Sequence, residues 1–203
     1  MRGAVLAGGA ATRYGGVPKG LLEVGGKRIL DRAVDAVSWV VRSMPILIAN
    51  APDAASWRSE LDTISDVRPG FGTLGGIYTA VTAAAEPVLC VAWDMPFLTG
   101  PLLRSLVERF EQGDCDAVLP ESGGRRGVEP LCAVYGPACA PAIARRLDLG
   151  GGDLKAISFH ADVRVGILPL AHVRSFGDPD KLFFNVNTPA DLARAEELWR
   201  QRA

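Results

Sequence analysis

A glycine-bearing, cationic loop over residues 7–19 is the segment whose residue types point most directly to chemistry. It follows a short apolar run and places two adjacent glycines, Gly8 and Gly9, before two cations, Arg13 and Lys19. Glycine lets backbone N–H groups approach an anion closely, and the two cations supply positive charge that a neutral loop lacks. The loop therefore predicts a site for a polyphosphate, and in the first instance for a nucleotide.

The spacing of this loop differs from that of two common phosphate loops. A P-loop has a glycine before its lysine and a hydroxyl residue after it, whereas Lys19 lies between Pro18 and Gly20. The dinucleotide fingerprint combines G-x-G-x-x-G with an acidic residue at the end of the second strand, whereas the expected second strand ends at the neutral Asn50. A P-loop NTPase and a hydride-transfer enzyme are therefore disfavoured. The remaining structural alternative is a surface turn with unrelated Arg and Lys.

An acidic side chain follows an apolar, strand-like run in the middle of the chain. Residues 88–92 are apolar throughout, as in a central parallel strand buried on both faces, and Asp94 comes two residues later. A carboxylate that faces a polyphosphate would repel it unless a divalent cation lay between them, so Asp94 implies a magnesium ion. The structural alternative is that Asp94 caps the turn before Pro96.

The order of strand-like and helix-like segments along the chain predicts an α/β fold that would position these residues. Strand-sized apolar runs alternate with helix-period segments, so we expect a single Rossmann-like three-layer domain over residues 1–203, with a mostly parallel central sheet flanked by helices. The expected strands are 2–6, 46–49, 63–67, 88–92, 117–120, 131–135 and 163–168. The expected helices are 29–44, 54–61, 77–85, 101–112, 137–147, 153–159 and a last helix that begins after an N-cap at Thr188.

A second glycine loop, residues 69–76, precedes the helix expected at 77–85 and includes Gly75. Open α/β sheets bind ligands outside the carboxyl ends of their strands. Both glycine loops and Asp94 follow such ends, so we expect all three to meet at one edge of the sheet.

Composition excludes several classes of protein. The chain has 203 residues, of which 48% are hydrophobic and 22% charged, and its net charge is −1, so nothing favours binding to nucleic acid or to a membrane. The longest apolar stretches are strand-sized, and the first apolar run leads straight into the glycine loop, so neither a membrane span nor a signal peptide is expected.

No C-x-x-C spacing occurs among the four cysteines, which are Cys90, Cys115, Cys132 and Cys139. Reduced, buried thiols and a cytoplasmic protein are expected.

Several segments, in order along the chain, carry a family resemblance: Leu6-Ala7-Gly8-Gly9, Lys19-Gly20-Leu21-Leu22, Gly72-Thr73-Leu74-Gly75-Gly76, Asp94-Met95-Pro96-Phe97, Glu129-Pro130-Leu131-Cys132 and Asn185-Val186-Asn187-Thr188-Pro189. Together they resemble the molybdenum cofactor guanylyltransferases (MobA-like) in order and spacing, nearly from end to end. Sugar-1-phosphate nucleotidyltransferases share the opening motif, but their loop is usually longer and carries a Leu-x-Pro element where this chain has Tyr14 and Gly15.

The resemblance implies a nucleotide-diphospho-sugar-transferase-like fold and transfer of GMP from GTP to the terminal phosphate of molybdopterin or its molybdenum-loaded form. Pyrophosphate and the guanine dinucleotide cofactor would be the products. It also implies transient contact with other molybdenum-cofactor biosynthesis proteins or with recipient apoenzymes.

The same resemblance assigns roles to particular residues. It implies nucleotide contacts at Leu6, Ala7, Gly8, Gly9, Lys19, Asn50, Asp66, Gly75 and Asp94. It implies pterin contacts at Asn185 and Asn187 and a magnesium ligand at Asp94. The expected catalytic residues are Arg13, Lys19 and Asp94. Arg13 is included because of its charge. The alternative for the two asparagines is ordinary turn chemistry before a capped helix.

Two departures from the family pattern put the base preference in doubt. Thr73 and Gly75 stand where the family usually has Pro and Ala, and Trp93 stands where a small residue is usual. A CTP-using relative, a sugar-phosphate nucleotidyltransferase and a non-catalytic nucleotide-binding module remain open. Arg125 and Arg126, in a loop expected to be a flap, would either clamp the pterin phosphate or remain solvated.

Overall fold

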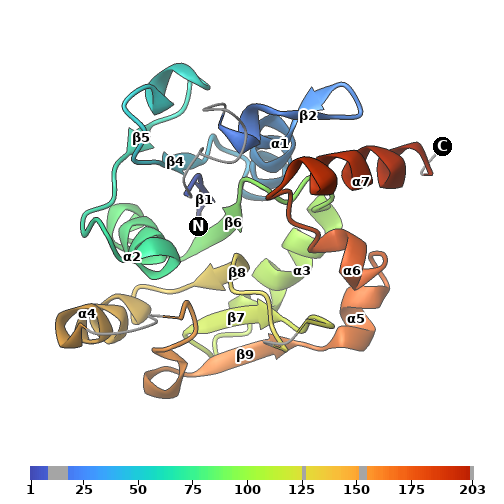
Figure 1. Cartoon of the computed structure of the whole chain (residues 1–203). Helices are drawn as coiled ribbons and strands as arrows, with labels where there is room; N and C mark the ends of the chain where they lie inside the picture. Colours follow the sequence, from blue (N-terminus) through green and yellow to red (C-terminus); the bar gives the residue numbers. More distant parts are fainter. Residues whose placement is uncertain (9–17, 125–126, 151–154, 202–203) are drawn as a thin grey trace.

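The computed structural model describes residues 1–8, 18–124, 127–150 and 155–201, and its centre is a seven-stranded sheet (Figure 1). The strand order is β5-β4-β1-β6-β8-β7-β9. The strands are β1 (Arg2–Leu6), β4 (Ile46–Ile48), β5 (Thr63–Ile64), β6 (Val88–Ala92), β7 (Ala117–Pro120), β8 (Cys132–Tyr135) and β9 (Val165–Leu168). Only β8 runs antiparallel to its neighbours in this sheet. The predicted mostly parallel sheet is confirmed.

Helices cover both faces of the sheet, as expected for three layers. The helices are α1 (Ile29–Val41), α2 (Gly72–Ala84), α3 (Gly100–Glu111), α4 (Cys139–Leu149), α5 (Leu170–Arg174), α6 (Pro179–Leu182) and α7 (Pro189–Arg200), with 3-10 turns η2 (Lys19–Leu21), η3 (Ala54–Ser56) and η4 (His160–Asp162). Helices α2 and α4 lie on one side of the sheet, and α1 and α3 on the other (Figure 1).

Side-chain alternation along the strands divides the core between these two faces. In β1, Ala4 and Leu6 pack toward α2, whereas Val5 packs toward α1. Every residue of β6 is buried, because a central strand is covered on both sides. The four cysteines are also buried and unpaired, as predicted.

Several boundaries differ from the sequence-based expectation. Helix α2 begins at Gly72 rather than at Ile77, so the second glycine loop is largely the first turn of the helix. Helix α1 ends at Val41 because Arg42 adopts a left-handed conformation (φ 56°), three residues before Pro45. Residues 155–159, where the end of a helix was expected, form turns before η4, and residues 153–154 lie outside the described part of the chain.

A two-stranded hairpin, β2 (Glu23–Val24) with β3 (Lys27–Arg28), was not predicted, nor were the short helices α5 and α6. Strands of two residues and helices of one turn are too short for a periodicity to appear in the sequence. The hairpin supports α7: the backbone N–H of Gly25 donates to Glu196, and a Cβ at Gly25 would lie 2.1 Å from the Trp199 ring.

The N-terminal cap of α7 was predicted correctly. The Thr188 hydroxyl accepts from the Asp191 N–H, and the Asp191 carboxylate accepts from the Thr188 N–H, forming a capping box. The Val186 N–H donates to the Asp94 carbonyl over 2.9 Å, so the segment before α7 lies directly against the end of β6. No helix in the described ranges is long and apolar enough to cross a membrane.

Candidate active site

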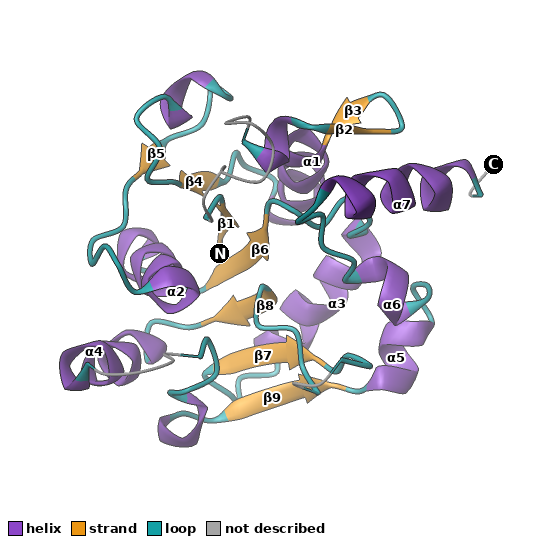
Figure 2. Cartoon of the chain, viewed as in Figure 1, coloured by secondary structure: helices purple, strands orange, loops and turns teal. Residues whose placement is uncertain are grey.

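The loops that follow β1, β4 and β6 lie together at the carboxyl ends of these strands (Figure 2). They border a cavity of about 710 Å³. Its lining includes most of the predicted site residues: Leu6, Ala7, Gly8, Lys19, Asn50, Asp66, Asp94, Asn185 and Asn187. Residues separated widely in sequence thus meet where the topology of an open α/β sheet predicts a ligand.

A charged cluster lies in this cavity where η2 approaches the turn after β6. The Lys19 ammonium donates to Asp94 Oδ2 over 2.5 Å and to Asn187 Oδ1 over 2.8 Å. The Asp94 side chain is only 9% exposed and that of Lys19 17%, so this ion pair is largely shielded from water. Three separate segments therefore place one cation, one anion and one amide in contact.

The backbone around Asn187 is held by the cap of α7. The Asn187 N–H donates to Asp191 Oδ2 over 3.0 Å, and the same oxygen accepts from the Thr188 N–H. Because the cap fixes the main chain on both sides of the turn, the Asn187 side chain is directed at Lys19 by local structure as well as by their mutual hydrogen bond.

The second carboxylate oxygen of Asp94 has no hydrogen-bond partner among the described residues. Oδ1 is buried and accepts no hydrogen bond in the described structure. A buried carboxylate oxygen without a donor is costly unless a ligand completes it. Among the described residues, no group of three His, Cys, Asp or Glu side chains could hold a metal ion by itself. One carboxylate does suit Mg²⁺, which retains water and is often shared between protein and substrate phosphates.

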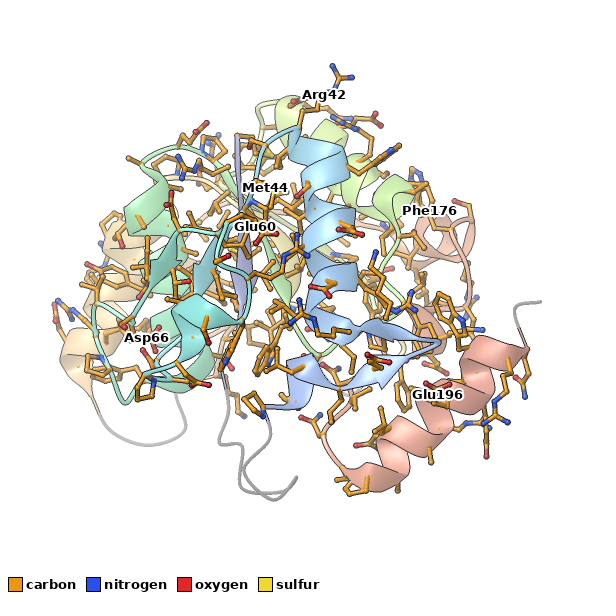
Figure 3. The ribbon with its side chains drawn as sticks, turned by 90° about the horizontal axis from the view of Figure 1, so that it is seen from above. Arg42, Met44, Glu60, Asp66, Phe176 and Glu196 are labelled. Atoms are coloured by element: carbon orange, nitrogen blue, oxygen red, sulfur yellow. The ribbon has the colours of Figure 1, made fainter. Side chains whose placement is uncertain are left out.

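A second polar pair, Asn50 with Asp66, also lines the cavity. Asn50 Nδ2 donates to Asp66 Oδ2 over 2.7 Å, and the Asp66 N–H donates to Asn50 Oδ1 over 2.8 Å. The next residue, Val67, donates its N–H to the buried Thr79 hydroxyl on α2. These bonds fix the Asp66 carboxylate at the cavity, on the side of the molecule away from Glu196 and α7 (Figure 3).

The start of α2 forms the cavity wall beside Asp66. Gly76 is a lining residue, and a Cβ at that position would lie 3.9 Å from Asp66 Oδ1. Gly75 itself does not line the cavity. A Cβ there would lie 3.0 Å from the Arg68 carbonyl, so the glycine permits close packing of the helix on the chain after β5. The first N–H groups of a helix lack intrahelical partners, which gives this wall donors for an anion.

The remaining wall includes residues that were not among the predicted site residues. These are Ile48, Gly70, Gly72, Thr73, Ala92, Trp93, Glu129 and Leu131. Glu129 stands in one of the motifs that carried the family resemblance, and its Oε1 accepts from the Leu131 N–H over 3.0 Å. Asn185 lines the same cavity and donates from its side chain to the Phe183 carbonyl over 2.9 Å.

Four predicted or candidate residues lie outside the described part of the chain. Gly9 and Arg13 belong to residues 9–17, and Arg125 and Arg126 form the second omitted segment of the chain.

The sequence and the fold are both similar to those of known proteins. Residues 3–163 match the model of the MobA-like NTP transferase domain. The chain is 35% identical to a probable molybdenum cofactor guanylyltransferase of Pelotomaculum thermopropionicum, over 97% of this chain and 92% of that protein. It is likewise 35% identical to a molybdenum cofactor guanylyltransferase of Desulfosudis oleivorans, over 97% and 94% of the two chains.

A solved structure agrees with these relatives. The crystal structure of molybdopterin-guanine dinucleotide biosynthesis protein A from Archaeoglobus fulgidus superposes with a TM-score of 0.82 at 29% identity, covering 99% of this chain and 100% of that one.

Proposed function

Because the chain belongs to the molybdenum cofactor guanylyltransferase (MobA-like) family of nucleotidyltransferases, we propose that it transfers GMP from GTP to the terminal phosphate of molybdopterin or its molybdenum-loaded form. The products are pyrophosphate and the guanine dinucleotide cofactor. The chain is a nucleotidyltransferase by family, and the proposal concerns which nucleotide and which acceptor it uses.

The contact of Lys19 with Asp94 and Asn187 is the observation that carries the proposal. A triphosphate and a phosphorylated acceptor are both anions, so a site that joins them needs positive charge where they meet. Lys19 supplies that charge between the nucleotide side of the cavity and the segment that contains Asn185 and Asn187.

The proposed reaction needs alignment and charge neutralisation more than proton transfer. An oxygen of the acceptor phosphate attacks the α-phosphorus of GTP, a new P–O bond forms, and the bond to the bridging α–β oxygen breaks. The electron pair of that bond leaves with pyrophosphate. Since the acceptor phosphate is already ionised at neutral pH, no general base is required.

Asp94 is proposed to hold Mg²⁺ through Oδ1, the carboxylate oxygen that has no partner within the described ranges. The ion would supply Lewis-acid charge at the reacting phosphates and hold them together as a template. Lys19 then exchanges its contact with Asp94 for contacts with the phosphates, while Asn187 continues to orient its ammonium group.

Base recognition is proposed for the Asn50–Asp66 pair and the first turn of α2. A carboxylate oxygen at Asp66 can accept hydrogen bonds from the N1 and N2 donors of guanine, whereas cytosine offers a single exocyclic amine. Backbone atoms of Leu6, Ala7 and Gly8 would contact the same nucleotide. The roles of Gly9, Gly75 and Arg13, and contacts with other proteins of the pathway in the cytoplasm, stay predictions.

The direct test is incubation of the purified protein with GTP, Mg²⁺ and molybdopterin, followed by detection of pyrophosphate and of the dinucleotide. A thermal-shift panel of GTP, CTP, UTP and ATP with Mg²⁺ tests the base separately. If CTP raises the melting temperature of the protein more than GTP does, the guanylyltransferase assignment is wrong. Nucleotide binding without pyrophosphate release, whichever acceptor phosphate is supplied, would indicate a non-catalytic module instead.

A further inference from the structure

The indole ring of Trp93 is enclosed between Gly20 and Trp57. The two indole rings stack with centroids 5.0 Å apart and planes inclined by 17°. On the Gly20 side, a Cβ added to that glycine would lie 2.1 Å from a ring carbon of Trp93. Trp93 is 3% exposed, so both of its faces are covered by protein.

These contacts involve the chain neighbours of the two charged residues in the candidate active site. Gly20 follows Lys19, and Trp93 precedes Asp94. The ring of Trp93 therefore packs against the backbone next to Lys19, and the backbone of Trp93 is bonded directly to Asp94. The Lys19–Asp94 ion pair and the packing of Trp93 on Gly20 thus both join these two segments.

The ring that supports Trp93 from the other side is itself anchored. Trp57 Nε1 donates to Asp53 over 3.0 Å, and its carbonyl accepts from Arg28 over 3.0 Å. Arg28 and Arg58 both bind the Asp31 carboxylate. Burial raises the pKa of Asp31, but the hydrogen bonds from the two arginines outweigh that effect and lower it, so the network stays charged at neutral pH. Trp57 is thus a fixed support rather than a loose loop residue.

Two neighbouring cavities border this arrangement. Trp93 lines the main cavity and also a smaller neighbouring cavity of about 280 Å³, whose lining includes Pro18, Lys19 and Trp57. A smaller side chain at position 93 would leave room between Gly20 and Trp57. The turn that carries Lys19 could then move inward, away from the position in which its ammonium contacts Asp94.

We propose that Trp93 is a positioning residue that acts through Lys19: its ring, held between Gly20 and Trp57, sets the place of the Lys19 ammonium relative to Asp94. The proposal rests on the proposed function, because it concerns the binding of the triphosphate. Misplacement of a charged group by about 1 Å is enough to lower the rate of an aligned reaction 100-fold. This chain has a large ring where a small residue is usual in the family, and the absence of a side chain at Gly20 leaves room for that ring.

The test compares Trp93→Ala, Trp93→Phe, Gly20→Ala and the double variant Gly20→Ala/Trp93→Ala by calorimetric binding of GTP with Mg²⁺. Trp93→Ala and Gly20→Ala should each weaken binding about 10-fold, and Trp93→Phe, which keeps a flat ring, about 3-fold or less. In the double variant the methyl group added at position 20 meets no ring. Adding Gly20→Ala to Trp93→Ala should therefore weaken GTP binding by no more than about 2-fold further. Coupling of this kind is what neighbouring residues in direct contact are expected to give.

A second cycle asks whether the effect passes through Lys19. In a Lys19→Met background, Trp93→Ala should change GTP binding less than 2-fold, because the group that it positions is gone. Phe159→Leu is the control, since Phe159 is fully buried near Tyr135, away from the cavity lining. It should lower the melting temperature without nucleotide and leave GTP binding unchanged.

Two outcomes would overturn the positioning role while leaving the proposed function intact. One is wild-type GTP affinity in Trp93→Ala despite a lowered melting temperature. The other is a Trp93→Ala effect of equal size with and without Lys19. Failure of the wild type to bind any nucleoside triphosphate would instead reject the proposed function, and the positioning role with it.

Discussion

The ammonium of Lys19 lies 2.5 Å from the carboxylate of Asp94, although 75 positions separate the two residues along the chain. Each is the other's counter-ion in the structure, and both line the same cavity. Any anion that binds Lys19 and any cation that binds Asp94 must therefore alter this pair. That makes nucleotide and metal binding interdependent.

Replacement of Lys19 by Met should weaken binding of GTP with Mg²⁺ by about 1.5–3 kcal/mol, the scale of a hydrogen bond to a charged group. Isothermal titration calorimetry measures the change. Lys27→Met is a matched control, because Lys27 pairs with Asp35 on an exposed surface outside the cavity. Wild-type affinity in Lys19→Met would place the ammonium outside the phosphate site.

The same variant should bind a divalent cation without nucleotide more tightly than the wild type. In the wild type the Lys19 ammonium competes with the metal for the Asp94 carboxylate, and Met removes the competing charge while keeping a similar length. Electron paramagnetic resonance of Mn²⁺ titrations reports free and bound ion directly. Equal Mn²⁺ affinity in the two proteins would contradict this competition.

Asp94→Asn should abolish turnover and leave most of the nucleotide affinity, because the amide keeps the shape of the side chain but loses the charge that holds the metal. Pyrophosphate release measures the first and calorimetry the second. Asp35→Asn, an exposed carboxylate outside the cavity, serves as the control and should be fully active. Unchanged turnover in Asp94→Asn would remove the metal role from this residue.

The two asparagines should differ in what they affect. Asn187 accepts from Lys19, whereas Asn185 bonds the Phe183 carbonyl. We therefore expect Asn187→Ala to raise both the Kd for GTP and the KM for the pterin substrate, and Asn185→Ala to raise chiefly the KM for the pterin. Identical profiles for the two variants would argue against a nucleotide-side role for Asn187.

Because of His160, the free energy of unfolding should decrease as the pH falls below 6.5. Burial lowers the pKa of this imidazole to about 4, from 6.5, so between these values the unfolded chain binds a proton that the folded protein does not. Folding stability therefore falls with decreasing pH across this window, by about 1–2 kcal/mol between pH 7 and pH 5. Urea unfolding at both values measures it.

The control for this titration is His160→Gln, which keeps a polar side chain but cannot be protonated. Other titratable groups contribute equally to the pH dependence of both proteins, so the quantity of interest is the difference between the two slopes. An identical slope for wild type and variant would mean that His160 is not protonated differently in the folded and unfolded states.

Local sequence patterns were sufficient for most of the fold. Alternation of apolar runs and helix-period segments located β1 and β6 and indicated a mostly parallel sheet, because burial on one or both faces leaves a periodic signature. The capping box at Thr188 and Asp191 was equally visible, since all of its hydrogen bonds join residues close in sequence. The start of α2 was missed because glycines are poor helix formers. Gly75 and Gly76 lie close to Arg68 and Asp66, and this tertiary packing leaves no periodic signal in the sequence.

By itself, the sequence determined the residue types at the site: a cationic glycine loop, a carboxylate after a buried strand and two asparagines before a capped helix. Only the tertiary structure decided which of them touch. Lys19 and Asn187 are 168 positions apart, and their contact depends on β6 lying beside β1 and on the segment before α7 returning over the end of β6. Such contacts arise from chain topology rather than from any local period, and the enclosure of Trp93 by Gly20 and Trp57 is of the same kind.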